Sequence, residues 1–515
     1  MALPRRWRWV IAVGLVAALG VAVWFFLRPD SSDLLPPTDN AAALNIPRTF
    51  DDAAMASVEV PLARPDASPV QVTSNYYYGL GIRPIYKSYS VYSPDREPPG
   101  YIDRLRQEEP QVLLQTGALK TTAGWIKAGE PVFEAPIGYG HIGGFTDDLY
   151  TRDPEWQRKV APPLLPDGTI PGLRYVVRAK GRVEIGVLSC AMCHSRVMPD
   201  GTLIKGAQGN FPFDRAWAWD YEHLPGWAGP LRSVFAHYLE RILFSAPWLG
   251  ASNPATLSDR LSYSELASFH SAIPPGVIAR HGTSVRLPAR VPDLIGIKDY
   301  RYLDSTGLVR HRDIGDVMRY AAMNQDTDME AKYLGVAPFA THQGRYSDEE
   351  LYALAQYLYS LQPPPNPYPF DATAAAGQNI FKRQGCPGCH TPPLYTNNKL
   401  TLAEGFTPPP EYLKKYDILP VSVGTDPGLA LKTRRGTGFY KVPSLKGVWY
   451  RGPFEHNGSV LALEDWFDPQ RLRDDYVPTG FKGYKVKTRA VRGHEFGLKL
   501  TPEEKRSLIA FLRTL

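Results

Sequence analysis

The first apolar stretch of the chain runs without a charge from Trp9 to Leu27, just after three arginines. About 19 residues at roughly 1.5 Å each span roughly 28 Å, which is close to a bilayer core of about 30 Å. The stretch ends in VWFFLRPD, without the small residues of a cleavage site. The pattern predicts a transmembrane anchor, with the rest of the chain on the periplasmic side of a bacterial inner membrane. A cleaved signal peptide is the alternative, and it would export the same body as a secreted protein.

Two later segments carry apolar residues at helical spacing, YSDEELYALAQYLYSLQ and LTPEEKRSLIAFLRTL. Each begins with a capping box, in which a hydroxyl and a glutamate three residues later satisfy each other's backbone N–H groups. The pairs are Ser347 with Glu350 and Thr501 with Glu504. The pattern therefore predicts two amphipathic helices, one near residue 350 and one at the end of the chain.

Chemistry enters with the four cysteines, which all lie in two short motifs, SCAMCHS and GCPGCHT. Each motif spells Cys-x-x-Cys-His, the attachment signature of c-type haem, whose thiols bind the porphyrin while the histidine binds the iron. A thioredoxin-like redox pair needs no histidine, and a zinc site joins pairs separated by about 15 to 20 residues. We therefore predict two covalently attached haem c groups. The attachment residues are Cys190, Cys193, Cys386 and Cys389, and the proximal iron ligands are His194 and His390.

Two segments of the chain resemble one another, ARVPDLIGIKDYRYLDSTGL at 289–308 and YKVPSLKGVWYRGPFEHNGS at 440–459. They share a Val-Pro-x-Leu-x-Gly core and a later glycine, and each lies downstream of one cysteine motif. Such internal similarity indicates related structural units in tandem. The run PPPNPYP at 363–369 reads as a stiff connector between them.

These observations predict a mainly α fold of two tandem cytochrome c-like haem domains, related by the internal repeat. A long irregular extension, rich in Tyr, Gly and Pro, precedes them, and the transmembrane helix precedes that. The predicted boundaries are 1–28 for the anchor or signal, 29–70 for a tether, 71–180 for the irregular extension, 181–362 for the first haem domain and 370–515 for the second.

The sixth iron ligand decides the chemistry, because a closed position favours electron transfer and an open one admits dioxygen or peroxide. All seven methionines lie at or before Met329, so beyond its motif the second half offers only His456 and His494. We predict His494 as the ligand, with His456 as the alternative. For the first iron the repeat places Ser305 where the second half has His456, so the candidate is His342, and an iron open on this side is the alternative.

Charge changes this picture little. The chain has 58 basic and 52 acidic residues, a formal charge of +6, and no dominant basic run, so we expect no nucleic-acid partner. The expected partners are a membrane, through the N-terminal helix, and a small or hydrophobic oxidisable substrate. The sequence does not specify a redox partner.

The two cysteine motifs, the segment VPSLKGVWYRGPFEHNGSVLALEDWF and the closing AFLRTL helix together resemble the dihaem cytochrome c peroxidase superfamily, over about residues 185 to 515. In that superfamily the distal ligand of the second haem lies shortly before the final helix, where this chain has His494. This ligand is methionine in typical peroxidases and tyrosine in the methylamine-utilisation relative. A histidine there, in GHEFGL, is similar to the dihaem rubber oxygenases, in which the second haem is bis-histidine and the first binds dioxygen.

The resemblance implies an exported oxidoreductase in which electrons pass through a bis-histidine second haem to a reactive first haem that binds dioxygen. Peroxidase-like reduction of hydrogen peroxide and a non-enzymatic, anchored electron carrier are the alternatives. Rubber oxygenases are longer chains and typically soluble, so polymer cleavage does not follow from the resemblance alone.

Overall fold

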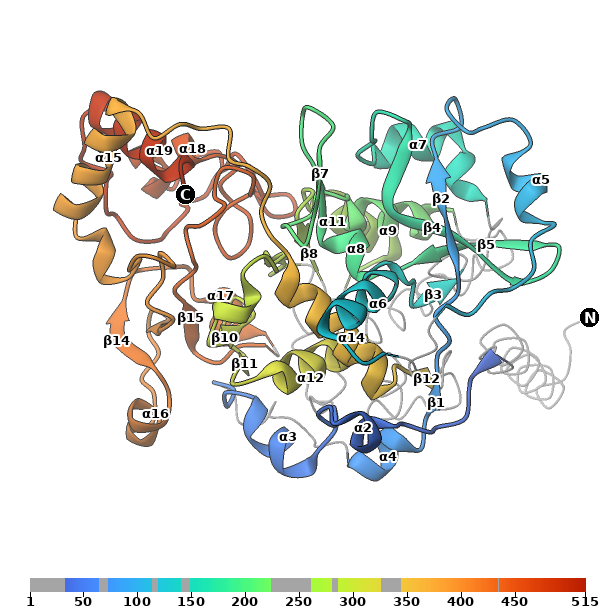
Figure 1. Ribbon diagram of the computed structural model, residues 1–515. Helices are drawn as coiled ribbons and strands as arrows, with labels where there is room; N and C mark the ends of the chain where they lie inside the picture. Colours follow the sequence, from blue (N-terminus) through green and yellow to red (C-terminus); the bar gives the residue numbers. More distant parts are fainter. Residues whose placement is uncertain are drawn as a thin grey trace, which may run out of the picture.

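The computed structural model describes residues 33–63, 73–113, 119–139, 149–223, 261–279, 286–325, 344–433 and 435–515 (Figure 1). The longer helices are α6 (Thr122–Glu134), α9 (Phe213–Glu222), α11 (Tyr263–Ser271), α12 (Ile314–Gln325), α14 (Asp348–Ser360), α15 (Ala372–Arg383) and α19 (Pro502–Arg513). Short helices include α2 (Ala41–Leu44), α3 (Asp52–Val58), α4 (Ser74–Tyr78), α5 (Tyr101–Leu105), α7 (Pro154–Val160), α8 (Cys190–Cys193), α16 (Pro410–Lys415), α17 (Gly428–Lys432) and α18 (Leu463–Trp466).

The prediction of a mainly α chain is wrong. Helices account for 36% of the residues and strands for 15%, and three of the four strands of the largest sheet lie inside the segment predicted to be irregular, with the fourth, β5, directly after it. The reason is that this segment is rich in β-branched and aromatic residues, as in TIPGLRYVVRA, which favour strands. In the order 2-4-5-3, the sheet contains β2 (Ser88–Tyr92), β4 (Thr169–Ala179), β5 (Arg182–Val187) and β3 (Gly138–Tyr139).

The predicted N-terminal transmembrane helix also needs correction. In the described part of the chain, no helix is long and apolar enough to cross a membrane. The stretch at 1–28, where the sequence predicts the anchor, lies outside the described residues.

The large sheet positions the first cysteine motif. Strand β5 ends at Val187, and Ser189 then caps the one-turn helix α8, its hydroxyl accepting a hydrogen bond from Met192 N. Helix α8 lies directly on β4 at Gly172, where an added Cβ would come within 2.4 Å of Met192 Cα. This glycine, with φ +86°, thus permits the close approach that seats the motif on the sheet.

Two helix pairs repeat one another on the two sides of the molecule. Helix α6 packs on α14 in the centre of Figure 1, and α15 packs on α19 at its upper left. Each crossing is made by a glycine: a Cβ on Gly129 would lie 2.0 Å from the Ala353 carbonyl oxygen, and one on Gly377 would lie 1.9 Å from that of Ser507. Four residues after each glycine, a phenylalanine packs on an aromatic ring of the partner helix.

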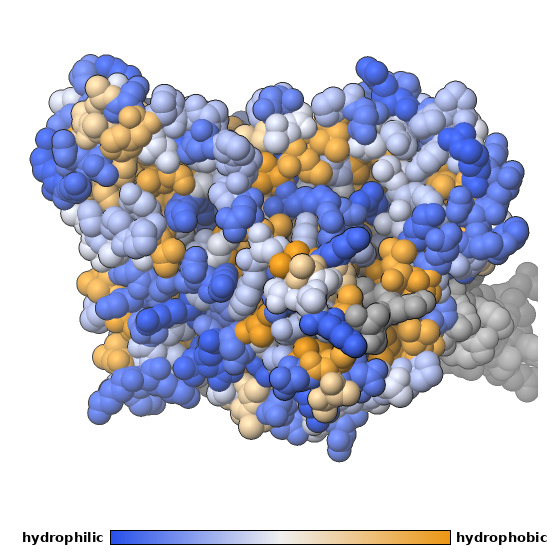
Figure 2. All heavy atoms as spheres, viewed as in Figure 1, coloured by the Kyte–Doolittle hydropathy of each residue, from blue (hydrophilic) through white to orange (hydrophobic). Residues whose placement is uncertain are grey.

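The predicted capping boxes are confirmed. In α14, Ser347 and Glu350 exchange hydrogen bonds between side chain and backbone, and in α19 Thr501 and Glu504 do the same. Both helices then present apolar residues to their glycine-bearing partners. On the face of the molecule that Figure 2 shows, most of the surface is hydrophilic and the apolar residues lie in separate groups.

The Val-Pro-x-Leu-x-Gly repeat also has one conformation in both halves. Asp304 and its equivalent Glu455 both adopt left-handed backbone, with φ +72° and +71°. Leu303 pairs with Val309 between β10 (Tyr302–Leu303) and β11 (Val309–Arg310), and the equivalent residues Phe454 and Val460 form the same antiparallel bridge. The further short strands are β1 (Gly81–Ile82), β6 (Ser195–Val197), β7 (Leu203–Lys205), β8 (Val277–Ile278), β9 (Ala289–Arg290), β12 (Gly344–Arg345), β13 (Leu400–Leu402), β14 (Ile418–Ser422) and β15 (Phe439–Lys441).

The two repeats bind each other reciprocally. Arg290 N donates to His456 O at 2.8 Å, and the equivalent Lys441 N donates to Ser305 O, equivalent to His456, at 3.1 Å. Such an exchange, in which residue i contacts residue j and j contacts i, is the mark of a two-fold arrangement. Arg290 and Lys441, which precede the Val-Pro pairs of the two repeats, are therefore each hydrogen-bonded to the other repeat.

Candidate functional site

The first cysteine motif borders a partly open cavity of about 120 Å³. Cys190, Cys193 and His194 all line it. The Nδ1–H of His194 donates to the Pro292 carbonyl oxygen at 3.0 Å, since a carbonyl can only accept. This bond fixes the ring and leaves the other ring nitrogen as the ligand atom, as in most metal-bound histidines.

The other walls of this cavity come from the Val-Pro loop, α12 and α14. Apolar side chains dominate, namely Ile278, Val291, Leu294, Ile297, Val317, Ala321, Leu354 and Leu358. Among the polar groups of the lining, the Asp304 carboxylate accepts from Tyr320 OH at 3.1 Å and pairs with Arg435 from the second half. An apolar cavity with a few fixed polar groups is typical of a cofactor site.

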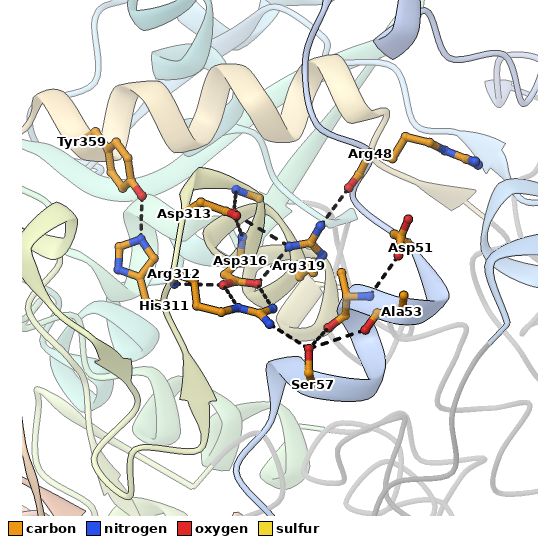
Figure 3. A network of polar contacts seen from close by, with 12 residues as sticks. Arg48, Asp51, Ala53, Ser57, His311, Arg312, Asp313, Asp316, Arg319 and Tyr359 are labelled. Carbon is orange, nitrogen blue, oxygen red and sulfur yellow. Dashed lines mark hydrogen bonds and ion pairs between the residues drawn. The ribbon is translucent and has the colours of Figure 1, made fainter. Parts of the chain in front are cut away.

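Helix α12, which lines the cavity, is fixed by ion pairs around one buried carboxylate near its start (Figure 3). Asp316 is fully buried and accepts from Arg312 Nη2 at 2.8 Å and from Arg319 Nη1 at 2.9 Å. Arg312 also donates to Ser57 Oγ of α3 at 2.7 Å. The N-terminal segment and α12 are therefore tied together beside the cavity.

The second motif lies at the surface rather than on a sheet. It forms a single 3₁₀ turn, Cys386–Gly388, in which Gly388 is exposed. The Nδ1–H of His390 donates to the Tyr395 carbonyl oxygen at 3.2 Å and also interacts with the carbonyl of Pro443, the equivalent of Pro292. Burial lowers the pKa of His390, so the ring is neutral near pH 7, as an iron ligand must be.

The structure places His494 beside His390. Burial, and then the neighbouring His390 imidazole, lower the pKa of His494 to about 4. Its Nδ1 is buried and has no hydrogen-bond partner among the described residues. The ring packs edge-on against Trp466, with centroids 5.3 Å apart. A neutral imidazole with a buried, unpartnered nitrogen is suited to bind a metal.

His456, the alternative ligand, contacts a carboxylate and an aromatic ring. Its Nδ1 pairs with the Glu455 carboxylate, and its ring lies 4.9 Å from that of Tyr440. His342, the candidate for the first iron, lies outside the described residues. Among the described residues that line the first cavity, His194 is the only histidine.

The His494 loop is held by one arginine. Arg471 is fully buried and donates to three carbonyl oxygens, those of Trp466 at 2.8 Å, Val491 at 2.8 Å and His494 at 2.7 Å. Charged donors make the stronger hydrogen bonds of proteins, so this guanidinium sets the position of the loop.

We expect Arg471→Met to destabilise the chain by about 3 kcal/mol, because three buried carbonyls lose their donor. Denaturant unfolding measures the loss, and absorption spectra report whether the second iron keeps its ligand. Arg473→Met is the matched control, since this side chain is 65% exposed and its ion pair is with the neighbouring, equally exposed Asp475. Equal losses in both variants would contradict the role given to Arg471.

The site contains residues that the sequence reasoning did not assign. The carbonyl oxygens of Pro292 and Pro443 interact with the two proximal histidines. Arg290 and Lys441 directly precede the two Val-Pro pairs. The signal was present in both cases, because the alignment of the two repeats already matches proline with proline and cation with cation. Thiols, imidazoles and cavity together fit a covalently held haem at the first motif, and the two imidazoles fit one at the second.

No protein-family model matches the chain. A segment is 34% identical over 105 residues to "Uncharacterized protein y4iJ" of Sinorhizobium fredii (strain NBRC 101917 / NGR234), and it covers 15% of this chain. The chain spans only 18% of the length of that relative.

Two solved structures are similar over part of the chain. A hydrazine synthase of Kuenenia stuttgartiensis, pressurised with xenon, is 16% identical with a TM-score of 0.26, over 45% of this chain and 73% of that one. A MauG-like protein associated with microbial copper homeostasis is 16% identical with a TM-score of 0.21, over 33% of this chain and 56% of that one. Likenesses this distant carry no argument about activity, which rests on the site itself.

Proposed function

We propose that the chain is an exported dihaem c-type oxidoreductase, in which a bis-histidine second haem passes electrons to a reactive first haem. One observation carries the proposal. At the second motif two neutral imidazoles, His390 and His494, lie close together, whereas the described residues at the first motif provide one imidazole and an open apolar cavity. One iron would be closed by the protein and the other accessible to a small molecule.

The exposure of the two motifs supports electron flow from the second haem to the first. The second motif is partly exposed at Gly388, while Ala191 and Met192 of the first motif are 4% and 2% exposed. A redox partner can therefore approach the second motif, whereas protein covers the two residues between the cysteines of the first. Bound haem would supply one-electron chemistry and dioxygen binding, while the protein supplies ligands, orientation and an apolar cavity.

Dioxygen is favoured over peroxide as the oxidant because of the polar groups beside the cavity. Peroxide cleavage is assisted by a general acid–base group that is free to move a proton. The carboxylate among the described cavity residues, Asp304, is held by Arg435 and Tyr320. An apolar cavity of this kind suits dioxygen and a hydrophobic, oxidisable substrate, as in the rubber oxygenases that the sequence resembles.

The test is the state of each iron in the purified, full-length protein. We expect a pyridine haemochrome assay to give two haems per chain, and electron paramagnetic resonance of the oxidised protein to give one low-spin haem. Absorption spectra of the reduced protein should show that the other haem binds carbon monoxide and dioxygen. Two low-spin haems without such reactivity would make the chain an electron carrier. Turnover of hydrogen peroxide without dioxygen uptake would make it a peroxidase, and a haem-free protein would overturn the proposal.

A further inference from the structure

Three cations gather at the interface between the two repeats. Arg290 lines the cavity of the first motif, Lys441 holds the equivalent position in the second repeat, and Arg451 lies near both. Burial, and then Arg451, lower the pKa of Arg290 to about 10. Burial lowers the pKa of Lys441 to about 8, and although Asp304 opposes this, Arg290 and Arg451 add to it. Three like charges thus lie near one another, with Arg451 buried and Arg290 and Lys441 half-buried, an arrangement that an anion bound between them would stabilise.

The carboxylates at this interface are already committed. Asp304 pairs with Arg435, and Glu455 pairs with His456. Asp293 accepts from Tyr450 OH at 3.0 Å and lies 3.7 Å from Arg451 Nε. Among the described residues, none of the three carboxylates is hydrogen-bonded to Arg290 or Lys441.

The side chains of Arg290 and Lys441 have donors to spare. Arg290 Nε is buried and has no hydrogen-bond partner in the described part of the chain. The Lys441 ammonium donates to the Tyr302 carbonyl oxygen at 3.4 Å and lies 5.2 Å from the Tyr300 ring centroid. Both backbone N–H groups are used across the interface, on His456 O and Ser305 O, so the two segments cannot swing away.

We propose that Arg290 and Lys441, at equivalent positions of the two repeats, each bind a carboxylate of the cofactor held by their own half. The inference rests on the proposed function, because the carboxylates are the propionates that haem carries. Two features favour propionates over free anions. Each cation lies two residues before the proline that interacts with its proximal histidine, and Arg290 faces the cavity into which the first motif points.

Redox potentials test the proposal on the intact dihaem protein. A cation beside a propionate favours the reduced, less positive haem iron relative to a neutral side chain. We expect Arg290→Leu to lower the reduction equilibrium constant of the first haem roughly tenfold, about 59 mV for one electron. We expect Lys441→Met to lower that of the second haem by a similar factor and to leave the first nearly unchanged. Resonance Raman spectra should show a shifted propionate bending mode in the same haem.

Arg290→Lys should restore most of the potential, which keeps the test usable if the leucine variant folds poorly. Arg286→Leu is the control, because this exposed cation of the same segment lies over Phe269 and outside the cavity lining. Unchanged potentials in Arg290→Leu and Lys441→Met would overturn the inference. The inference would also be overturned if the reduction potentials of the wild-type protein changed when phosphate buffer replaced a zwitterionic buffer, since that change would show a free anion bound at the cations. If the variants keep two haems per chain and their potentials do not change, the proposed function is retained and only the propionate inference fails. If the wild-type protein contains no haem, both proposals fail.

Discussion

The His494→Ala variant is expected to convert the second haem from low spin to high spin while its two thioether bonds remain. The reason is that His494 is the described imidazole that lies beside His390, with a buried nitrogen that has no other partner. Loss of a strong axial ligand leaves the iron five-coordinate or water-bound. Electron paramagnetic resonance and the absorption spectrum of the oxidised protein measure the change.

The matched control is His456→Ala. His456 is paired with Glu455 and packed on Tyr440, so its loss should cost stability and leave the low-spin signal in place. A low-spin second haem in His494→Ala, together with its loss in His456→Ala, would move the ligand to His456.

A second large effect is expected from Gly377→Leu, which should weaken or abolish packing of α15 on α19. The first carbon of any side chain at this position would lie 1.9 Å from the Ser507 carbonyl oxygen, a backbone atom that cannot turn away. Overpacking of this kind costs about 3 kcal/mol, and the two helices must separate to relieve it. Thermal unfolding followed by circular dichroism measures the loss.

Ala376→Leu on the same helix provides the comparison, because this neighbour is exposed and a leucine there meets only solvent. The two variants add similar apolar bulk to α15, and only one adds it at the crossing. If both lowered the unfolding temperature equally, added bulk anywhere on α15 rather than the crossing would explain the result.

Local chemistry was the part of this protein that the sequence could predict. Two capping boxes appear where the hydroxyl and glutamate pairs indicate, because a cap is decided by residues three positions apart. The alignment of Ser305 with His456 also has a structural counterpart, since the two carbonyls receive equivalent N–H groups. Each of these features depends on short spacing or on direct internal similarity.

Features that join distant segments were missed. Helix α6 belongs with α14, although more than fifty residues, including strands β4 and β5, separate it from the first cysteine motif. A signal existed, because AGEPVF in α6 and AGQNIF in α15 share the glycine and phenylalanine that make the crossings. The insertion hid the correspondence, and strand-forming residues within it were taken for irregular chain. The position of His494 beside His390 likewise depends on a loop fixed by Arg471, which no local pattern reports.

The reciprocal pairing of the two Val-Pro segments bears on where this chain came from and how it can be divided. An exchange in which each repeat completes the other is what a symmetric homodimer leaves when two copies of its gene are joined end to end. Cleavage at the proline connector would therefore yield two fragments, in each of which the Val-Pro segment lacks its hydrogen-bond partner from the other repeat. Mixed together, such fragments should associate again, because each supplies the hydrogen-bond partner that the other lacks.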